Sequence, residues 1–151
     1  MIVFFYDSTF EGLLSAVFDA YTGGVFPDAL LSQGDSAPLT AVAPHTVITR
    51  DDKVERVFRG LEKKLSPFAL SGLLYASLAE GAGLSLFRYI RKVFDAPGRV
   101  EGNLADPDVL AVDQLTRKVG REKHHVMGFA RFQKTAQGVY IAVVEPCCNV
   151  L

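Results

Sequence analysis

The amino-acid sequence predicts an α+β fold, in which a small, mainly antiparallel sheet packs against about five helices. The first observation is a short, apolar, β-rich run at residues 2–6. The second is a series of segments in which apolar residues recur at helical spacing. The third is a pair of β-rich segments, 129–134 and 139–145, joined by a turn that contains Gly138. Because a lone hairpin is only marginally stable, we expect the N-terminal strand to join the C-terminal hairpin in one sheet.

The chain is long enough to form one domain with a substantial core. Of its 151 residues, 49% are hydrophobic and 22% are charged, which is an ordinary globular composition. It contains no internal repeat and no linker that would divide it. We therefore expect a single domain over residues 1–151.

The N-terminal part predicts one strand followed by one helix. Residues 2–6 are apolar on both faces, as in a strand that is covered on both sides. Asp7 or Ser8 is expected to cap the next helix, and the Gly-Gly pair at 23–24 is expected to end it.

The middle of the chain predicts a long loop and then four more helices. Residues 25–45 hold three prolines and predict a loop, and residues 46–49 predict a brief strand. The start signals of the four helices are Asp51 or Asp52, Ser66-Pro67, the glycines up to Gly83, and Asp106-Pro107. The last of these helices is expected to reach about residue 127, just before the hairpin.

The charged residues are distributed unevenly. Residues 1–49 hold five acidic residues and no Lys or Arg, so residues 50–151 carry all 16 basic residues against 12 acidic ones. This split favours a basic surface that contacts a polyanion. The alternative is a solvated helix surface with local ion pairs, such as Asp113 with Arg117. The candidate nucleic-acid-binding residues lie on three predicted helix exteriors: Arg56, Arg59, Lys63, Arg88, Arg91, Lys92, Arg117 and Arg121.

Glu122 lies on the apolar face of the long helix, one turn from Val119 and Val126. A carboxylate in this place needs a partner, because a buried unpaired charge is costly. Arg131 is the candidate partner, since a guanidinium can bind a carboxylate through two parallel hydrogen bonds. Glu122 is then either half of a structural ion pair or a general base.

The candidate catalytic residues are Asp7, Glu122, His124 and Arg131. His124 offers acid–base chemistry near neutral pH. Tyr6 and Asp7 end the first strand, at the rim of a sheet where functional side chains gather. Asp7 and His124 also have a non-catalytic interpretation, because Asp7 suits a helix cap and His124 suits an exposed helix face.

Cys147 and Cys148 are the two cysteines of the chain. Adjacent cysteines cannot link distant segments, and with only three histidines in the chain they make a poor zinc site. We expect neither a metal nor a cofactor. The N-terminus lacks the features of a signal peptide and no apolar run suits a membrane span, so we expect a cytoplasmic protein that does not contact a membrane.

Several segments together resemble one protein family. They are residues 5–21 (FYDSTFEGLLSAVFDAY), 57–65 (VFRGLEKKL) and 128–132 (GFARF), with Glu122 and His124 ahead of the third and Glu145-Pro146 after it. In this combination the chain resembles a bacterial family described as DNA metabolism proteins and otherwise as a domain of unknown function. The resemblance implies a setting in DNA repair or modification, with a radical SAM protein as companion and, in some relatives, fusion to a uracil-DNA glycosylase domain.

The chain departs from this family in two places. Relatives commonly carry Arg where this chain has His125, and they continue past residues 149–151 with another helix and strand. We therefore expect a C-terminally truncated form, lacking that helix and strand.

Three functional hypotheses follow from the sequence. The first is a DNA-associated accessory module, partner of a radical SAM enzyme. The second is an enzyme that acts on a nucleic-acid base or phosphodiester, with Asp7, Glu122, His124 and Arg131 around one cleft. The third is a module that binds only proteins.

Overall fold

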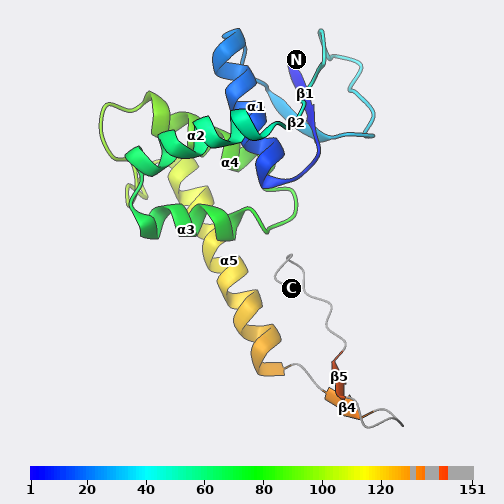
Figure 1. The fold of residues 1–151 in the computed structure, drawn as a ribbon, viewed down its shortest axis with the longest axis vertical. Helices are drawn as coiled ribbons and strands as arrows, with labels where there is room; N and C mark the ends of the chain where they lie inside the picture. The colour runs from blue at the N-terminus through cyan, green and yellow to red at the C-terminus, as the bar shows by residue number, and fades with distance from the viewer. Residues whose placement is uncertain (130–131, 135–139, 143–151) are drawn as a thin grey trace.

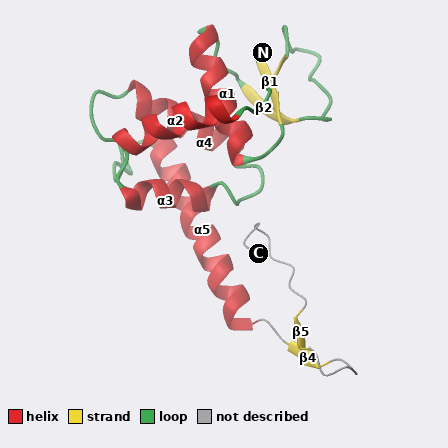
Figure 2. Cartoon of the chain, viewed as in Figure 1, coloured by secondary structure: helices red, strands yellow, loops and turns green. Residues whose placement is uncertain are grey.

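The computed structural model describes residues 1–129, 132–134 and 140–142, with side chains as far as Lys123. Five helices and five short strands lie in this part of the chain (Figures 1 and 2). In chain order they are β1 (Val3–Tyr6), α1 (Phe10–Gly23), β2 (Ala29–Ser32), β3 (His45–Thr46), α2 (Asp51–Lys64), α3 (Pro67–Ala76), α4 (Gly83–Asp95), α5 (Pro107–Phe129), β4 (Phe132–Lys134) and β5 (Tyr140–Ala142).

The N-terminal sheet is parallel, so the predicted antiparallel sheet is wrong. Its strand order is β2-β1-β3, and β1 pairs in parallel with both neighbours. Strands β4 and β5 pair with each other in a separate antiparallel sheet, and neither pairs with β1. The overall α+β class and the five helices agree with the prediction.

The error came from β2, which lies inside the segment predicted to be a loop. This strand has four residues and stands between Pro27 and Gly34, so turn residues mask it in the sequence. Asp28 secures its start, because its carboxylate accepts from the Ile2 backbone N–H at 2.8 Å and its own N–H donates to the Ile2 carbonyl at 2.8 Å. Helix α1 is the crossover connection between the parallel strands β1 and β2. Strand β1 is the central strand of the sheet, as expected for a strand that is apolar on both faces.

Capping side chains set the starts of two helices. Thr9, and not Asp7 or Ser8, caps α1 by accepting from the Gly12 N–H at 2.9 Å. Ser66 caps α3 as predicted, accepting from the Ala69 N–H at 3.2 Å. Helix α1 ends as predicted at its glycine pair, where Gly24 adopts a left-handed φ of 67°.

Helix α2 begins without a side-chain cap. Arg50 occupies the cap position, and the predicted caps Asp51 and Asp52 lie in the first turn. Acidic residues there interact favourably with the free backbone N–H groups, so these residues still stabilise the helix start.

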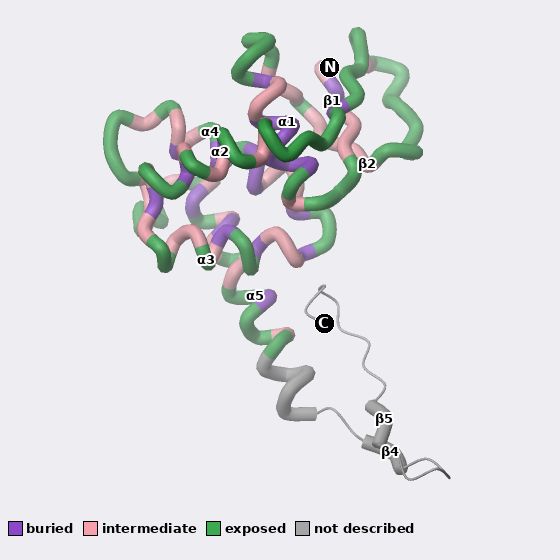
Figure 3. The backbone as a smooth tube through the Cα atoms, viewed as in Figure 1, coloured by how far each residue is buried: buried purple, intermediate pink, exposed green. Residues whose placement is uncertain are grey.

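The core lies where the helices meet. Helix α1 packs against α2, α4 and β1, and α5 packs against α3 and α4. The largest fully buried side chains include Phe87, Leu13, Leu61 and Leu73. Beyond this packed region α5 continues past the other helices, and most of residues 117–123 are exposed, although Val119 is buried (Figures 1 and 3).

One charged cluster joins three elements. The Asp19 carboxylate of α1 contacts Lys53 Nζ of α2 at 2.7 Å and His45 Nε2 of β3 at 2.8 Å. Lys53 and Asp19 are largely shielded, with side-chain exposures of 12% and 14%. The cluster therefore ties the short strand β3 to the helices beside the sheet.

Candidate functional site

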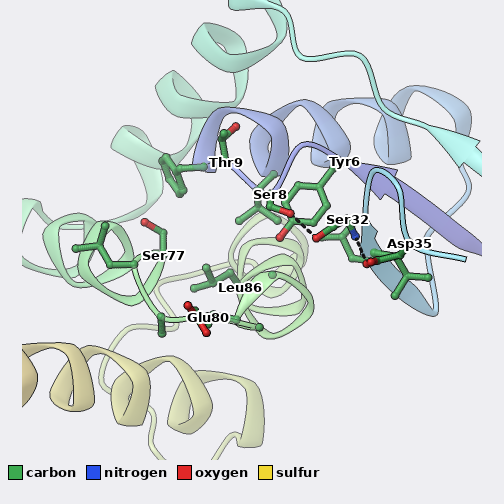
Figure 4. Close-up of a pocket in the computed structure, with 17 residues that line it drawn as sticks. Tyr6, Ser8, Thr9, Ser32, Asp35, Ser77, Glu80 and Leu86 are labelled. Atoms are coloured by element: carbon green, nitrogen blue, oxygen red, sulfur yellow. Dashed lines mark hydrogen bonds between the residues drawn. The ribbon is translucent and has the colours of Figure 1, made fainter. Parts of the chain in front are cut away.

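A pocket of about 850 Å³ opens at the carboxyl ends of β1 and β2 (Figure 4). Tyr6 and Ser32 are register partners at these strand ends, and both line the pocket. The opposite wall is the turn between α3 and α4 together with the start of α4. This is the edge of a parallel sheet where ligands commonly bind, because loops and helix starts converge there.

The sheet side of the pocket carries a short chain of hydrogen bonds. Ser8, which turns the chain from β1 into α1, has a positive φ of 64°, an uncommon conformation for a residue other than glycine. Its hydroxyl lies 2.6 Å from the hydroxyl of Ser32. The Ser32 N–H donates to one carboxylate oxygen of Asp35 at 3.0 Å. Ser8, Ser32 and Asp35 are therefore held in fixed places along one wall (Figure 4).

Tyr6 reaches across the pocket to the start of α4. A Cβ atom at Gly83 would overlap the Tyr6 hydroxyl, so the glycine makes room for this ring. Burial raises the pKa of the Tyr6 hydroxyl; hydrogen bonding with Ser8 opposes the rise and the nearby Asp7 charge adds to it. Tyr6 therefore stays a neutral hydroxyl at physiological pH.

The pocket is acidic and rich in hydroxyl groups. Its lining includes Asp35 and Glu80, and no Lys, Arg or His among the residues that the structure describes. The Ser77 hydroxyl lies on the α3 side and donates to the Leu74 carbonyl at 2.5 Å. Two carboxylates without a cation disfavour a phosphate and suit a neutral ligand that carries hydroxyl groups.

The sequence anticipated only part of this pocket. It predicts Tyr6 as a strand-end residue at the rim of the sheet, and Tyr6 lines the pocket. It does not predict Ser32, Asp35 or Glu80, because they come from the segment expected to be a loop and from the α3–α4 turn. The short apolar run Ala29–Leu31, between Pro27 and Gly34, is the local signal that could have pointed to a strand ending at Ser32.

Asp7, a predicted catalytic residue, supports the start of α1. Its carboxylate accepts from the N–H and hydroxyl of Thr9, at 3.0 and 2.6 Å, and from the Thr49 hydroxyl at 2.7 Å. Burial alone would raise the pKa of this carboxyl, but the hydrogen bonds from Thr9 and Thr49 outweigh it and lower the pKa below its usual value. Asp7 is not among the residues that line the pocket.

The other three catalytic candidates lie on or after the far part of α5. Glu122 is half-buried, near the end of the part of α5 whose side chains the structure describes. The side chain of His124 and the whole of Arg131 lie outside the described residues, as do Cys147 and Cys148. Among the side chains that the structure describes, none of these candidates is brought beside Asp7.

Three of the predicted nucleic-acid-binding residues pair with acids on their own helix, and one of them, Arg91 of α4, lies 3.5 Å from Asp95. Arg117 contacts Asp113 at 2.9 Å, which confirms the predicted local pair. Arg59 pairs with Glu55, one turn earlier on α2. Exposed pairs of this kind contribute little to stability, and their cations remain accessible.

On α4, Lys92 and Arg91 also contact residues outside their own helix. Lys92 contacts Asp106 at 2.5 Å and Asp108 at 3.1 Å, and hydrogen bonds to these two carboxylates, Asp106 first, raise its pKa. The Arg91 guanidinium lies 3.7 Å from the ring centroid of Phe26. Both side chains therefore help to hold α4 against neighbouring segments.

The remaining four predicted binders are exposed. Arg56, Lys63, Arg88 and Arg121 form no ion pair with any side chain in residues 1–123. They belong to three helices, of which α5 extends away from α2 (Figure 1). The densest basic stretch is therefore on α5 itself, where Lys118 is also exposed.

The geometry defines an α+β protein with a polar pocket at the edge of a parallel sheet and a basic helix at the opposite end. Residues 80–151, just under half of the chain, match the family model described as Domain of unknown function (DUF4130). This match agrees with the expected family of unknown function and runs from the α3–α4 turn through α4 and α5. No curated protein and no solved structure matches the chain.

The residues that the structure describes offer neither a metal-binding cluster nor a membrane-spanning helix. Within that part of the chain, no group of three or more His, Cys, Asp and Glu side chains is placed to hold a metal ion. None of its helices combines the length and apolar character that a membrane crossing requires.

Proposed function

We propose that the chain is a DNA-associated accessory module that contacts phosphates through the basic part of α5. The observation that supports this most is the run 117–123, which carries four exposed cations and one acid, Glu122. The cations are Arg117, Lys118, Arg121 and Lys123. A net charge of +3 over two turns of a helix that extends beyond its neighbours suits a polyanion (Figure 1).

The family resemblance adds a biological setting to this proposal. It favours DNA repair or modification over transcription or packaging, and it implies a radical SAM enzyme as the partner that performs the chemistry. Co-purification of this chain with such an enzyme from one bacterial lysate tests the partnership, and repeated failure at low salt would contradict it.

The salt dependence of DNA binding tests the phosphate contacts. Replacing Lys118 and Arg121 with Gln should lower the slope of log affinity against log salt by roughly 0.7–0.9 for each phosphate that is no longer neutralised. Fluorescence anisotropy with a labelled oligonucleotide between about 50 and 200 mM salt measures this slope. The matched control replaces Arg50 and Arg59, which are also exposed but pair with Asp52 and Glu55.

The control variant removes the same charge from a different part of the surface. We expect it to bind DNA with the slope of the parent protein. Equal effects of the two double variants would mean that only net charge matters, and an absence of binding at low salt would end the proposal.

We propose as a second function that the sheet-edge pocket binds a neutral, hydroxyl-bearing small molecule of nucleoside type. The acids and hydroxyls of Asp35, Glu80 and Ser32 can accept from ligand hydroxyls, and the leucine side chains of the lining, such as Leu30 and Leu86, offer an apolar surface to a ring. This function is independent of α5.

Adenosine and its 5′-monophosphate are suitable probes of the pocket. Adenosine should raise the melting temperature of the protein and the monophosphate should raise it less, because two carboxylates repel the added charge. Asp35→Asn should abolish the adenosine effect, whereas Glu11→Gln, which removes an exposed carboxylate outside the pocket, should leave it intact. Equal shifts with both ligands would contradict the assignment.

A further inference from the structure

A second hollow, mainly apolar, lies between α3, α5 and the loop at residues 101–104. It has a volume of about 810 Å³. Its floor consists of the buried side chains of Leu73, Tyr89 and Val112. Gly72 of α3 and Gly120 of α5 also line it. We call this hollow the α3–α5 groove.

Two exposed aromatic rings stand along the α3 side of the α3–α5 groove. Phe68 is 90% exposed and Tyr75 is 41% exposed. They are seven residues apart, so they lie on one face of α3 about 10 Å from each other along the helix axis. Leu104, on the opposite side, is 44% exposed. A scattered apolar residue on a surface is ordinary, but three that border one groove indicate a binding surface.

Cations of α5 border the same groove. Lys123 Nζ lies 5.4 Å from the ring centroid of Tyr75 and 3.4 Å from its hydroxyl. Arg117 lines the groove as well, and its partner Asp113 is beside it. The α3–α5 groove therefore combines aromatic rings with positive charge at distances that one bound molecule can span.

The acids of the groove are already occupied. Glu101 accepts from the Ser66 N–H at 2.8 Å and from its hydroxyl at 2.5 Å, and these bonds lower its pKa, the side-chain bond most. Asp113 is paired with Arg117. The two acidic and two basic side chains that line the groove cancel in charge. The net positive charge beside the groove therefore comes from Lys118 and Arg121, which lie on α5 outside it.

We infer that the α3–α5 groove holds the bases of a single-stranded DNA segment, with the phosphates along the basic part of α5. The inference rests on the proposed function and specifies its substrate class. Aromatic rings beside a positively charged path are how proteins bind unpaired strands, because every base offers a face for stacking. In a duplex the bases stack on one another inside the helix, so Phe68 and Tyr75 would have little to contact.

Binding of a labelled oligo-dT strand and of a duplex of equal length tests this inference. We expect the parent protein to prefer the single strand. Phe68→Ala and Tyr75→Ala should each weaken single-strand binding about tenfold, the effect of losing one stacked base, and leave duplex binding unchanged. The salt slope should stay the same in both variants, because neither removes a cation.

Leucine at both positions provides a matched control that keeps apolar bulk and removes only the aromatic face. The Phe68→Leu, Tyr75→Leu variant should lose single-strand affinity as the alanine variants do. If leucine restores full affinity, the groove holds an apolar partner and the inference is overturned. If single strand and duplex bind equally in all variants, the inference fails while phosphate contact by α5 stands. Absence of binding to either DNA ends both.

Discussion

Replacing Phe87 with Ala should lower the free energy of unfolding by about 3–5 kcal/mol, because it leaves a cavity in the centre of the helical core. Phe87 belongs to α4 and is among the largest fully buried side chains of the protein. Urea unfolding followed by circular dichroism measures the change. The control is Phe68→Ala, which removes a ring that is 90% exposed and should change stability by less than about 0.5 kcal/mol.

This pair of variants also distinguishes side chains that stabilise the core from those that only border the α3–α5 groove. A small loss for Phe87→Ala would mean that the helices around α4 are loosely packed. A large loss for Phe68→Ala would mean that this ring stabilises the fold, and its effect on DNA binding could not then be assigned to stacking.

Replacing Gly12 with Ala should destabilise the protein by about 1–3 kcal/mol, although alanine is the better helix former by about 1 kcal/mol. The new Cβ would overlap Asp7 Oδ1, which accepts from Thr9. Moving Asp7 breaks the bonds that hold the cap residue Thr9 and the Thr49 hydroxyl. Thermal unfolding of the two proteins measures the difference.

Gly120→Ala is the matched control for this prediction. Gly120 lies inside α5, and nothing that the structure describes lies within 4 Å of the position of a new Cβ atom. Alanine there should therefore raise stability by about 0.5–1 kcal/mol. A gain at both positions would show that Asp7 yields easily and that its hydrogen bonds contribute little.

The helices were predictable because their signals are local. Ser66-Pro67 starts α3, Pro107 starts α5, and apolar residues at helical spacing mark the faces that pack. The parallel sheet was not predictable in the same way. Its second strand is four residues long and pairs with β1 across α1, so its evidence is a long-range pairing that leaves no periodic pattern.

The contacts of the candidate site residues were likewise predictable where they are local and unpredictable where they are long-range. The Asp113–Arg117 pair follows from helix spacing and was predicted. The contact of Lys92 with Asp106 joins α4 to the start of α5 across 14 positions, so spacing alone could not show that this cation is engaged. Asp7 shows a third case, because a strand-end carboxylate suits both catalysis and support of a helix start until its partners are known.

The distribution of charge along the chain gives the fold an acidic N-terminal part and a basic α5. The sheet and α1 come from residues 1–49, which hold five carboxylates and no Lys or Arg, whereas the described part of α5 carries a cluster of cations at the other end. A polyanion such as DNA attracts the basic end of the protein and repels the acidic end. A diffusing protein molecule is therefore oriented before it contacts the DNA. DNA would then be met by α5 first, while the acidic N-terminal part of the protein is repelled by it.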